Sequence, residues 1–267
     1  MAYKSLDIAR WLIKQATTDV SNIDGEPLTN MKLQKLMYYV QGYFIALFSQ
    51  PAFADDKIEA WMYGPVVPGI YDYYSKYGHN ALPAENSTLE MPVREKRLMM
   101  MVYNYYRNFS AVGLMRRTHL ESPWRESLPH GRGTVISESV MSNYFEGQLP
   151  QLLQCNAENA VDELSQLSEG WDHYGTPSPS QRSIENSKKI VNKVPFLKLL
   201  ELNVSPSEVG GVILNFGTDR HNLVGCNCGD DTFSWYIRKC GRRVSYKSYM
   251  QYSDIAINEL TSAISEL

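Results

Sequence analysis

The stretch from Thr29 to Leu47 reads TNMKLQKLMYYVQGYFIAL and decides the fold of the first half of the chain. Its apolar residues recur at the three- and four-residue spacing that places them on one helix face. They are Leu33, Leu36, Met37, Val40, Phe44 and Leu47. The Thr29 hydroxyl is positioned to accept a hydrogen bond from the first helical turn. The pattern therefore predicts a capped amphipathic helix, with Lys32, Gln34 and Lys35 outside its apolar stripe.

Helical spacing continues on both sides of this segment. Ser5 is expected to cap a helix that carries Leu6, Ala9, Leu12, Ile13 and Ala16, and a turn follows at residues 22–27. Further helices are predicted at residues 70–77 with Gly78 as the end, at 93–106, at 114–124, and after a Ser137 cap. Residues 58–63 alternate and predict a short extended piece, and Pro65 and Pro68 exclude a helix interior directly after it.

The pattern changes after a junction expected at residues 150–159. Alternating segments at 212–216, 222–226 and 232–237 predict strands, and the gaps between them have hairpin length. Ser180 or Ser183 is expected to cap a helix before these strands, and a second helix is predicted at 249–264. The sequence therefore predicts two domains. Residues 1–150 form a mainly α domain, and residues 160–267 form a small α+β module with a three-stranded antiparallel meander and flanking helices.

Composition narrows the function classes. The chain has 267 residues and a net charge of −3, and neither part carries the basic excess typical of proteins that bind phosphate backbones. A nucleic-acid partner is therefore not favoured. No apolar run reaches the length of a membrane span, and the N-terminus has no apolar secretory core. We expect a cytoplasmic protein without a membrane partner.

The four cysteines are Cys155, Cys226, Cys228 and Cys240. Cys226 and Cys228 are two residues apart in a predicted strand, so their side chains should share one face. The spacings do not match the two-residue knuckles of structural zinc sites. Buried small side chains are the favoured interpretation, with no metal and no cofactor.

Four ordered blocks of residues 5–147 resemble a known family. The first is Thr29-x-x-Lys32-Leu33-Gln34-Lys35-Leu36-x-Tyr38, continuing to Gln41-Gly42. The second is Glu59-Ala60-Trp61-x-Tyr63-Gly64-Pro65-Val66-Val67-Pro68, followed by Tyr71. The third is Thr118-His119-x-Glu121-x-Pro123-Trp124, and the fourth is a helix that ends Tyr144-Phe145. In these blocks the N-terminal ~150 residues resemble the Panacea (SocA-like) antitoxin domain family, with an additional, uncharacterised C-terminal module.

The resemblance implies a compact, mostly helical domain that neutralises a cognate toxin by direct contact, without enzymatic turnover. The toxin is expected to be encoded beside it. Other members of the family are proteolytic adaptors, or occur in phages and mobile elements as regulators, and these alternatives stay open. So do a homo-oligomer and, as a third class, an enzyme centred on His119 and Glu121.

Candidate partner-binding residues are Lys32, Lys35, Tyr38, Tyr39, Glu59, Tyr71, His119 and Glu121. Residues expected to be structural are Trp61, Gly64, Pro65, Pro68, Pro123 and Trp124. An enzyme would use His119 as a general base oriented by Glu121, but a polar network that fixes the loop is the favoured interpretation because the sequence shows no convincing nucleophile. Lys32 or Lys35 is expected either to pair with Glu59 or Glu121 or to lie on an exposed helix face.

Overall fold

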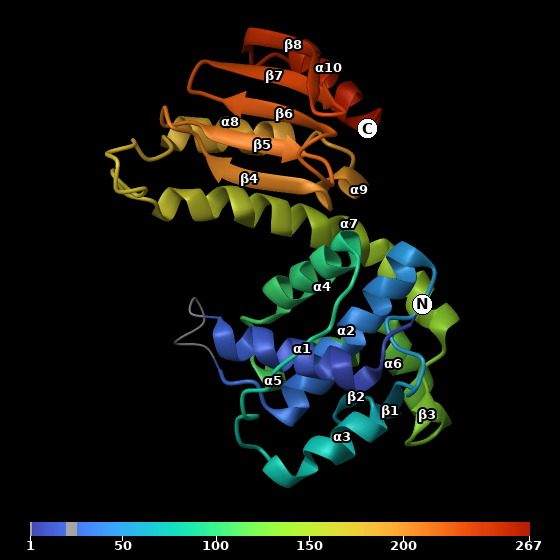
Figure 1. Ribbon diagram of the computed structural model, residues 1–267. Coiled ribbons are helices and arrows are strands. Elements are labelled where there is room, and N and C mark those ends of the chain that lie inside the picture. Colours follow the sequence, from blue (N-terminus) through green and yellow to red (C-terminus); the bar gives the residue numbers. More distant parts are fainter. Residues whose placement is uncertain (1, 20–25) are drawn as a thin grey trace. The chain divides into compact units, whose positions relative to one another are not determined.

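The computed structural model describes residues 2–19 and 26–267. The chain forms two compact units, Met1–Leu152 and Leu153–Leu267 (Figure 1). The turn predicted at residues 22–27 falls largely outside the described residues. Among the described residues, no helix is both long enough and apolar enough to cross a membrane.

The first unit is mainly helical, as predicted. Its helices are α1 (Ser5–Thr18), α2 (Asn30–Phe48), α3 (Pro68–Tyr74), α4 (Val93–Tyr106), α5 (Ala111–Leu120), α6 (Ser122–Ser127) and the first part of α7 (Glu138–Asp162). Short 3₁₀ turns are η2 (Ser75–Tyr77) and η3 (Leu128–His130). A small antiparallel sheet of order β2-β1-β3 joins β1 (Glu59–Trp61), β2 (Gly64–Val66) and β3 (Thr134–Val135). The extended piece predicted at 58–63 is therefore the central strand of this sheet.

Helix α2 is the centre of the first unit. It contacts α1, α3, α4, α5 and β2, and the sixteen residues from Asn30 to Ile45 include only one that is not buried, Met31. The predicted apolar stripe is present, but the opposite side is buried as well. Lys32, Gln34 and Lys35 lie outside the apolar stripe, as predicted, but all three are buried because neighbouring elements surround the helix. The alternative of an exposed helix face for Lys32 and Lys35 is therefore wrong.

The helix caps follow the sequence with one exception. Thr29 accepts a hydrogen bond from the Lys32 amide, and Ser137 accepts one from the Val140 amide. Ser5 does not cap α1, since the cap residue is Lys4, which makes no side-chain cap bond. Instead, the Asp55 carboxylate accepts hydrogen bonds from the Ser5 amide and hydroxyl. A distant acidic side chain has thus replaced the local cap.

The second unit is built on a sheet of five antiparallel strands, order β4-β5-β6-β7-β8. The strands are β4 (Leu202–Pro206), β5 (Val212–Phe216), β6 (Leu223–Cys228), β7 (Thr232–Lys239) and β8 (Arg242–Gln251). The predicted three-stranded meander corresponds to β5–β7. The predicted number of strands was wrong, because one more strand, β4 or β8, pairs at each edge. Neither edge strand has the buried alternation of the centre, and β4 ends at Pro206, a residue tolerated at sheet edges.

Helices complete the second unit. They are the second part of α7, the 3₁₀ turn η4 (Glu163–Gln166), α8 (Gln181–Val191), α9 (Phe196–Leu199) and α10 (Asp254–Ser265). Ser180 caps α8, as one of the two predicted candidates. The last helix begins at Asp254 after a Ser253 cap, not at Tyr249, because Tyr249 belongs to β8.

The junction expected at residues 150–159 is helical. Helix α7 runs through it without a break and contains Pro150. Proline removes one backbone donor from a helix interior, but buried apolar residues recur four apart on both sides of it, at Leu149, Leu153, Ala157 and Val161. This continuous apolar stripe offsets the missing donor, so the two units are joined by a helix.

Candidate functional site

The first unit contains a cleft of about 590 Å³ between α2, the β1–β2 hairpin, α3 and the start of α5. Aromatic side chains line it, namely Trp61, Tyr63 and Tyr71, together with Met62 and Val112. Its remaining lining includes Asn30, Gln34 and Lys35 from α2, and Arg132 from the segment before β3. An apolar hollow with a few convergent polar groups is the usual form of a binding site.

The polar lining contributed by α2 is fixed by hydrogen bonds. The Gln34 amide donates to the Asn30 side-chain oxygen at 2.9 Å and accepts from the Val67 amide at 2.9 Å. The Asn30 amide donates to the Tyr71 carbonyl at 3.0 Å. These bonds join α2 to α3 and to the end of the β1–β2 hairpin. The α2 side of the cleft is therefore preformed.

Lys35 is the one charged side chain of this part of the lining. Its Nζ donates to the Pro65 carbonyl at 2.8 Å, and the residue is only 1% exposed. Burial disfavours the ammonium form and lowers the pKa of Lys35 from 10.5 to about 7. Near neutral pH the amine and the ammonium are thus both populated.

Gly64 is required beside this lysine. Its φ is +97°, which L side chains rarely adopt, and an added Cβ would lie 2.8 Å from Lys35 Cε and 2.9 Å from Nζ. Pro65 is buried and supplies the carbonyl that Lys35 binds, while Pro68 occupies the first turn of α3, where its missing donor costs nothing. The Gly64–Pro68 block therefore positions the wall of the cleft.

Trp61 and Tyr71 form one side of the cleft, and Glu59 is bonded to Trp61 without lining the cleft itself. The Trp61 indole donates to the Glu59 carboxylate at 2.8 Å, and its ring meets the Tyr71 ring edge-on with centroids 5.1 Å apart. The Arg132 guanidinium lies 4.8 Å from the Trp61 ring centroid, within the range of a cation–π contact. Arg132 was missed by the sequence analysis, since an arginine between two glycines has no pattern that marks a site.

His119 and Trp124 form a stacked pair that is bonded to the backbone of Trp61. Their rings are stacked with centroids 3.9 Å apart, and the Trp124 indole donates to the Trp61 carbonyl at 2.8 Å. Trp124 and Pro123 are both buried. Burial, aided by the Lys35 charge, lowers the pKa of His119, so its neutral form is favoured. This packing fits the structural role expected for Trp61, Pro123 and Trp124.

Glu121 belongs to a different cluster. Its carboxylate accepts a hydrogen bond from Tyr39 at 3.0 Å and lies 3.5 Å from Arg117 Nε. Burial raises the pKa of Glu121 from 4.5 to about 7. Tyr39 stacks on Tyr106 with centroids 3.7 Å apart, and Tyr38 is fully buried beside it. Glu121 is therefore bonded to Tyr39 and Arg117. This arrangement does not support Glu121 as the group that orients His119.

The eight candidate partner-binding residues are thus divided. Tyr71 and Lys35 line the cleft, whereas Glu59 is bonded to the lining residue Trp61 and His119 stacks on Trp124. Lys32 is buried and its Nζ donates to the Arg107 carbonyl at 2.7 Å and the Glu26 carbonyl at 3.3 Å, so it pairs with neither Glu59 nor Glu121. Tyr38, Tyr39 and Glu121 form the buried cluster.

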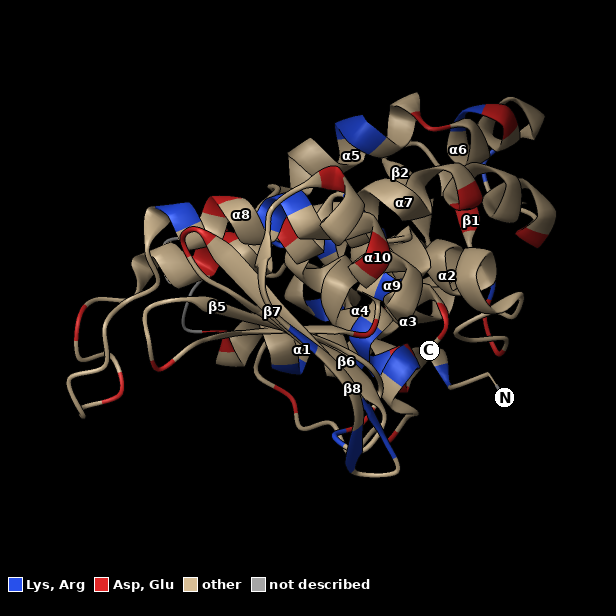
Figure 2. Cartoon of the chain, turned by 90° about the horizontal axis from the view of Figure 1, so that it is seen from above, with Lys and Arg blue, Asp and Glu red and all other residues tan. Residues whose placement is uncertain are grey.

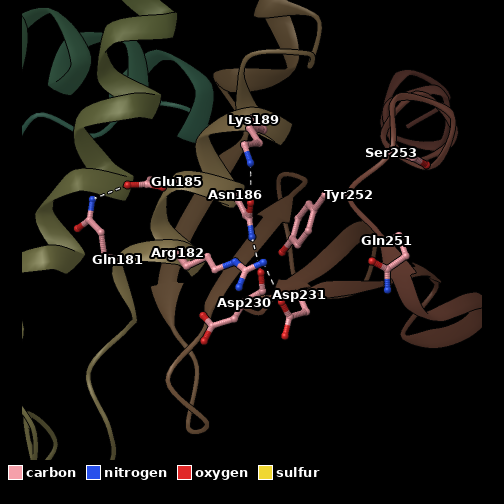
Figure 3. A pocket seen from close by; sticks show the side chains of 10 residues that line it. All are labelled: Gln181, Arg182, Glu185, Asn186, Lys189, Asp230, Asp231, Gln251, Tyr252 and Ser253. Atoms are coloured by element: carbon pink, nitrogen blue, oxygen red, sulfur yellow. Dashed lines mark hydrogen bonds and ion pairs between the residues drawn. The ribbon is translucent and has the colours of Figure 1, made fainter.

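The second unit contains a polar hollow of about 600 Å³ between α8, the β6–β7 turn and the end of β8 (Figure 3). Its charged groups are already paired. Arg182 lies 2.9 Å from the Asp231 carboxylate, Lys189 donates to the Asn186 side-chain oxygen at 2.9 Å, and Asn186 donates to the Asp230 carbonyl at 2.8 Å. Such internal bonding stabilises the turn and leaves little capacity for a ligand.

The two strand cysteines share one face, as predicted. The Cys226 and Cys228 sulfurs are 3.6 Å apart and both side chains are buried. Within residues 2–19 and 26–267, no group of three or more histidine, cysteine, aspartate or glutamate side chains is arranged to hold a metal ion.

Comparisons with known proteins place the matched segment in the first unit. Residues 33–125 match the family described as Antitoxin SocA-like, Panacea domain. Antitoxin SocA of Caulobacter vibrioides (strain NA1000 / CB15N) is 38% identical over 52 residues, which are 20% of this chain and 27% of that relative. The similarity therefore spans about a quarter of the relative's length. No solved structure gives a significant match.

Proposed function

We propose, from the premise that the N-terminal region is a SocA-like Panacea domain, that this protein neutralises a cognate toxin by binding it directly. The matched segment, residues 33–125, supplies most of the cleft lining. A relative of this segment is named as an antitoxin. The partner is a protein toxin, which we expect to be encoded beside this protein.

The main support for this binding surface is the exposed tip of the β1–β2 hairpin. Met62 and Tyr63 form this tip at the mouth of the cleft, and their side chains are 69% and 66% exposed. Tyr71 and Val112 extend the apolar surface across the cleft to α3 and α5. Methionine and tyrosine are enriched in protein interfaces, and tyrosine buries a large area at low entropic cost. We therefore infer that a side chain of the toxin enters the cleft beside this tip.

Neutralisation is then steric and requires no chemical step. The Glu121 carboxylate is only 4% exposed and is bonded to Tyr39 and Arg117. His119 is stacked on Trp124. Both arrangements favour structural roles, which supports a protein that acts by occupying the toxin rather than by turnover.

Co-expression with the neighbouring toxin tests this proposal. We expect the wild-type protein to restore growth and to co-purify with the toxin. The double variant Met62→Asp, Tyr63→Asp should lose both properties, because two carboxylates at the hairpin tip cannot be desolvated in an apolar interface. Its circular dichroism spectrum and melting temperature should match those of the wild type.

Leu120→Asp is the matched control. Leu120 is an apolar residue of the same unit, 78% exposed, and does not line the cleft. This variant should protect as the wild type does. If the double variant also protects and co-purifies, the interface does not include the hairpin tip. If the wild type forms no complex with a toxin from which it protects, direct binding is wrong.

We also propose that residues 1–150 and 160–267 are domains that fold separately. Limited proteolysis of the full chain tests this. Helix α7 covers residues 148–160, so the first cuts are expected in the turns after it, around residues 167–175, where Tyr174 is 92% exposed. First stable fragments that end within residues 30–140 would contradict two domains.

A further inference from the structure

The two faces of the five-stranded sheet differ in chemistry. One face carries buried apolar residues, including Leu214 of β5, Cys226 of β6 and Trp235 of β7. Helix α8 contacts β5 and β6 and covers this face (Figure 1), and α10 is bonded to it at its edge through Glu259 and Lys247. The strand period places the intervening residues on the opposite face. They are Asn203, Ser205, Ile213, Asn215, Leu223, Gly225, Asn227, Thr232, Ser234, Tyr236, Arg238, Arg243, Tyr246 and Gln251, of which Ile213 and the buried Leu223 are apolar.

Tyr236 lies flat on this polar face. Gly225 is its partner on β6, and a Cβ at Gly225 would stand 2.4 Å from the Tyr236 Cζ atom. The ring therefore covers the backbone of β6, and any larger residue at position 225 would lift it. One side of the ring is packed on the sheet, and guanidinium groups lie over the ring. This is the geometry of a platform on which a flat group stacks.

Tyr246 extends the platform. It pairs with Tyr236 across β7 and β8, which places the two rings side by side on the same face, and it is 66% exposed. Two arginines lie over the Tyr236 ring, with the guanidinium carbons of Arg243 and Arg238 at 4.8 Å and 5.6 Å from its centroid, within the range of cation–π contacts. A base that stacks at Tyr236 therefore displaces a guanidinium group or stacks on it. Asn227 and Ser234 supply neutral hydrogen-bonding groups on the same face.

The β7–β8 hairpin that carries this platform is basic. The hairpin of β7 and β8 contains Arg238, Lys239, Arg242, Arg243 and Lys247, and no acidic residue. Figure 2 shows the corresponding blue segments along β8 and at its turn with β7. Lys247 is engaged by Glu259 on the other face of the sheet, and Arg238 donates to the Arg220 carbonyl at 3.1 Å. The remaining basic groups give this end of the sheet a local positive potential in a chain of net charge −3.

We propose that the polar face of the C-terminal sheet binds single-stranded nucleic acid, with bases stacked on Tyr236 and Tyr246 and phosphates near Arg238, Arg242 and Arg243. Aromatic rings on an open sheet face, combined with basic side chains along one path, are the elements that bind unpaired bases without sequence selectivity. Base pairs in a duplex cannot stack on such rings. An acidic protein segment would use the charges but would have no use for two aromatic rings.

This site is independent of the toxin-binding surface proposed in the first unit. The whole-chain composition does not favour a nucleic-acid partner, but it averages over both units and hides the basic hairpin. Asp230 and Asp231 lie at the β6–β7 turn, at the opposite end of β7. Asp219 lies in the β5–β6 turn at the same end as the basic hairpin turn, where its carboxylate accepts hydrogen bonds from the His221 and Asn222 amides.

Fluorescence anisotropy with the full chain tests the proposal. The probes are a labelled 20-residue oligothymidylate and a labelled duplex of the same length, at low salt. We expect the single strand to bind more tightly than the duplex, and its affinity to fall as salt is raised. Tyr236→Ala and Tyr246→Ala should each weaken binding by roughly 5- to 100-fold, the loss typical of one stacked base. Tyr236→Phe should retain most of the affinity, because the ring remains.

Arg182→Ala is the control for charge alone. Arg182 belongs to the same unit and is paired with Asp231 at the acidic end, so its removal should leave the affinity unchanged. The proposal is overturned if the wild type binds no single strand at low salt, or if the two alanine variants bind as the wild type does. Equal displacement of the oligonucleotide by polyglutamate, without any effect of the tyrosine variants, would assign the face to an acidic protein segment instead.

Discussion

Tyr39 on α2 and Tyr246 on β8 show how differently the two units use the same side chain. Tyr39 is fully buried, stacks on Tyr106 at 3.7 Å and donates a hydrogen bond to Glu121. Tyr246 is 66% exposed on an edge strand that has no buried residue along its length. The first unit thus encloses polar groups around a central helix, whereas the second unit presents them on a sheet.

This contrast bears on where each unit is sensitive to substitution. A buried polar group contributes only while its partner is present, so removing one member leaves the other desolvated and unbonded. An exposed residue of an edge strand has water as its alternative partner, and its removal changes the stability little. The stability of the first unit should therefore depend on the α2 residues, and the proposed binding of single-stranded nucleic acid should depend on exposed β8 residues rather than on the stability of the fold.

The largest effect is expected for Tyr39→Ala. It removes a fully buried ring and deprives the Glu121 carboxylate of its tyrosine donor. Large-to-small changes of buried aromatic residues cost about 3–5 kcal/mol. Urea denaturation followed by circular dichroism measures the loss, and Tyr39→Phe separates the ring from the hydroxyl. A loss for Tyr39→Ala similar to that for Tyr246→Ala would remove the distinction between the two regions.

The sequence predicts the helices of the first unit well and the surroundings of α2 poorly. Helix boundaries at 93–106 and the Thr29 cap follow from local patterns that the structure confirms. For Lys32 and Lys35 the sequence leaves two alternatives, a pair with Glu59 or Glu121 or an exposed helix face, and the structure shows neither. Their partners are backbone carbonyls of residues 65 and 107, and a backbone acceptor leaves no trace in the sequence.

The edge strands β4 and β8 were not predicted because too few of their residues are buried. Strand β5 and the first half of β7 alternate because one face is buried, and β6 is buried at all but one residue, but all residues of β8 are exposed or half-buried. Without a buried face there is no alternation to detect. At the candidate site, the aromatic and proline block of residues 59–71 was identified from the sequence, whereas Arg132 and the flat Tyr236 ring depend on tertiary contacts.

The second largest effect is a pH dependence carried by Glu121 and Lys35. The pKa of Glu121 is raised to about 7 in the folded state. Its contribution to the free energy of unfolding is therefore fully present below about pH 4.5 and is lost as pH rises to about 7. The pKa of Lys35 is lowered to about 7, so the folded state binds fewer protons than the unfolded chain between about pH 7 and 10.5, and stability rises across that range.

The two contributions together predict a minimum in the stability of the first unit near pH 7. At about 1.4 kcal/mol per pKa unit, the shifts correspond to roughly 3 kcal/mol on the acid side and roughly 5 kcal/mol on the alkaline side, as orders of magnitude. Urea denaturation between pH 4 and 10 measures it. Glu121→Gln should flatten the acid side only, and Lys35→Met the alkaline side only. Profiles that these substitutions leave unchanged would mean that other groups carry the pH dependence.

A smaller effect is expected for Gly42→Ala on α2. A Cβ at this position would lie 2.1 Å from the Phe145 ring, which is fully buried. Overpacking of this kind costs about 1–3 kcal/mol. Gly147→Ala is the matched control, because Gly147 lies in helix α7 with open space where a Cβ would be added. That substitution should raise the stability by up to about 1 kcal/mol. If both variants shift the urea midpoint in the same direction, the close packing of α2 does not determine the result.

The smallest effect on stability is expected for Tyr246→Ala. The side chain is largely exposed, and its cross-strand partner Tyr236 is held by its own contact with Gly225. Surface changes of this kind are usually within about 0.5 kcal/mol. The same variant is expected to lose affinity for a single-stranded oligonucleotide, so stability and binding should separate at this position. At Tyr39 no such separation is possible, since the ring supports the fold itself. A Tyr246→Ala protein that unfolds at a clearly lower urea concentration would contradict this expectation. The edge strand would then depend on the Tyr246 ring for its stability, and the polar face would be part of the packed structure.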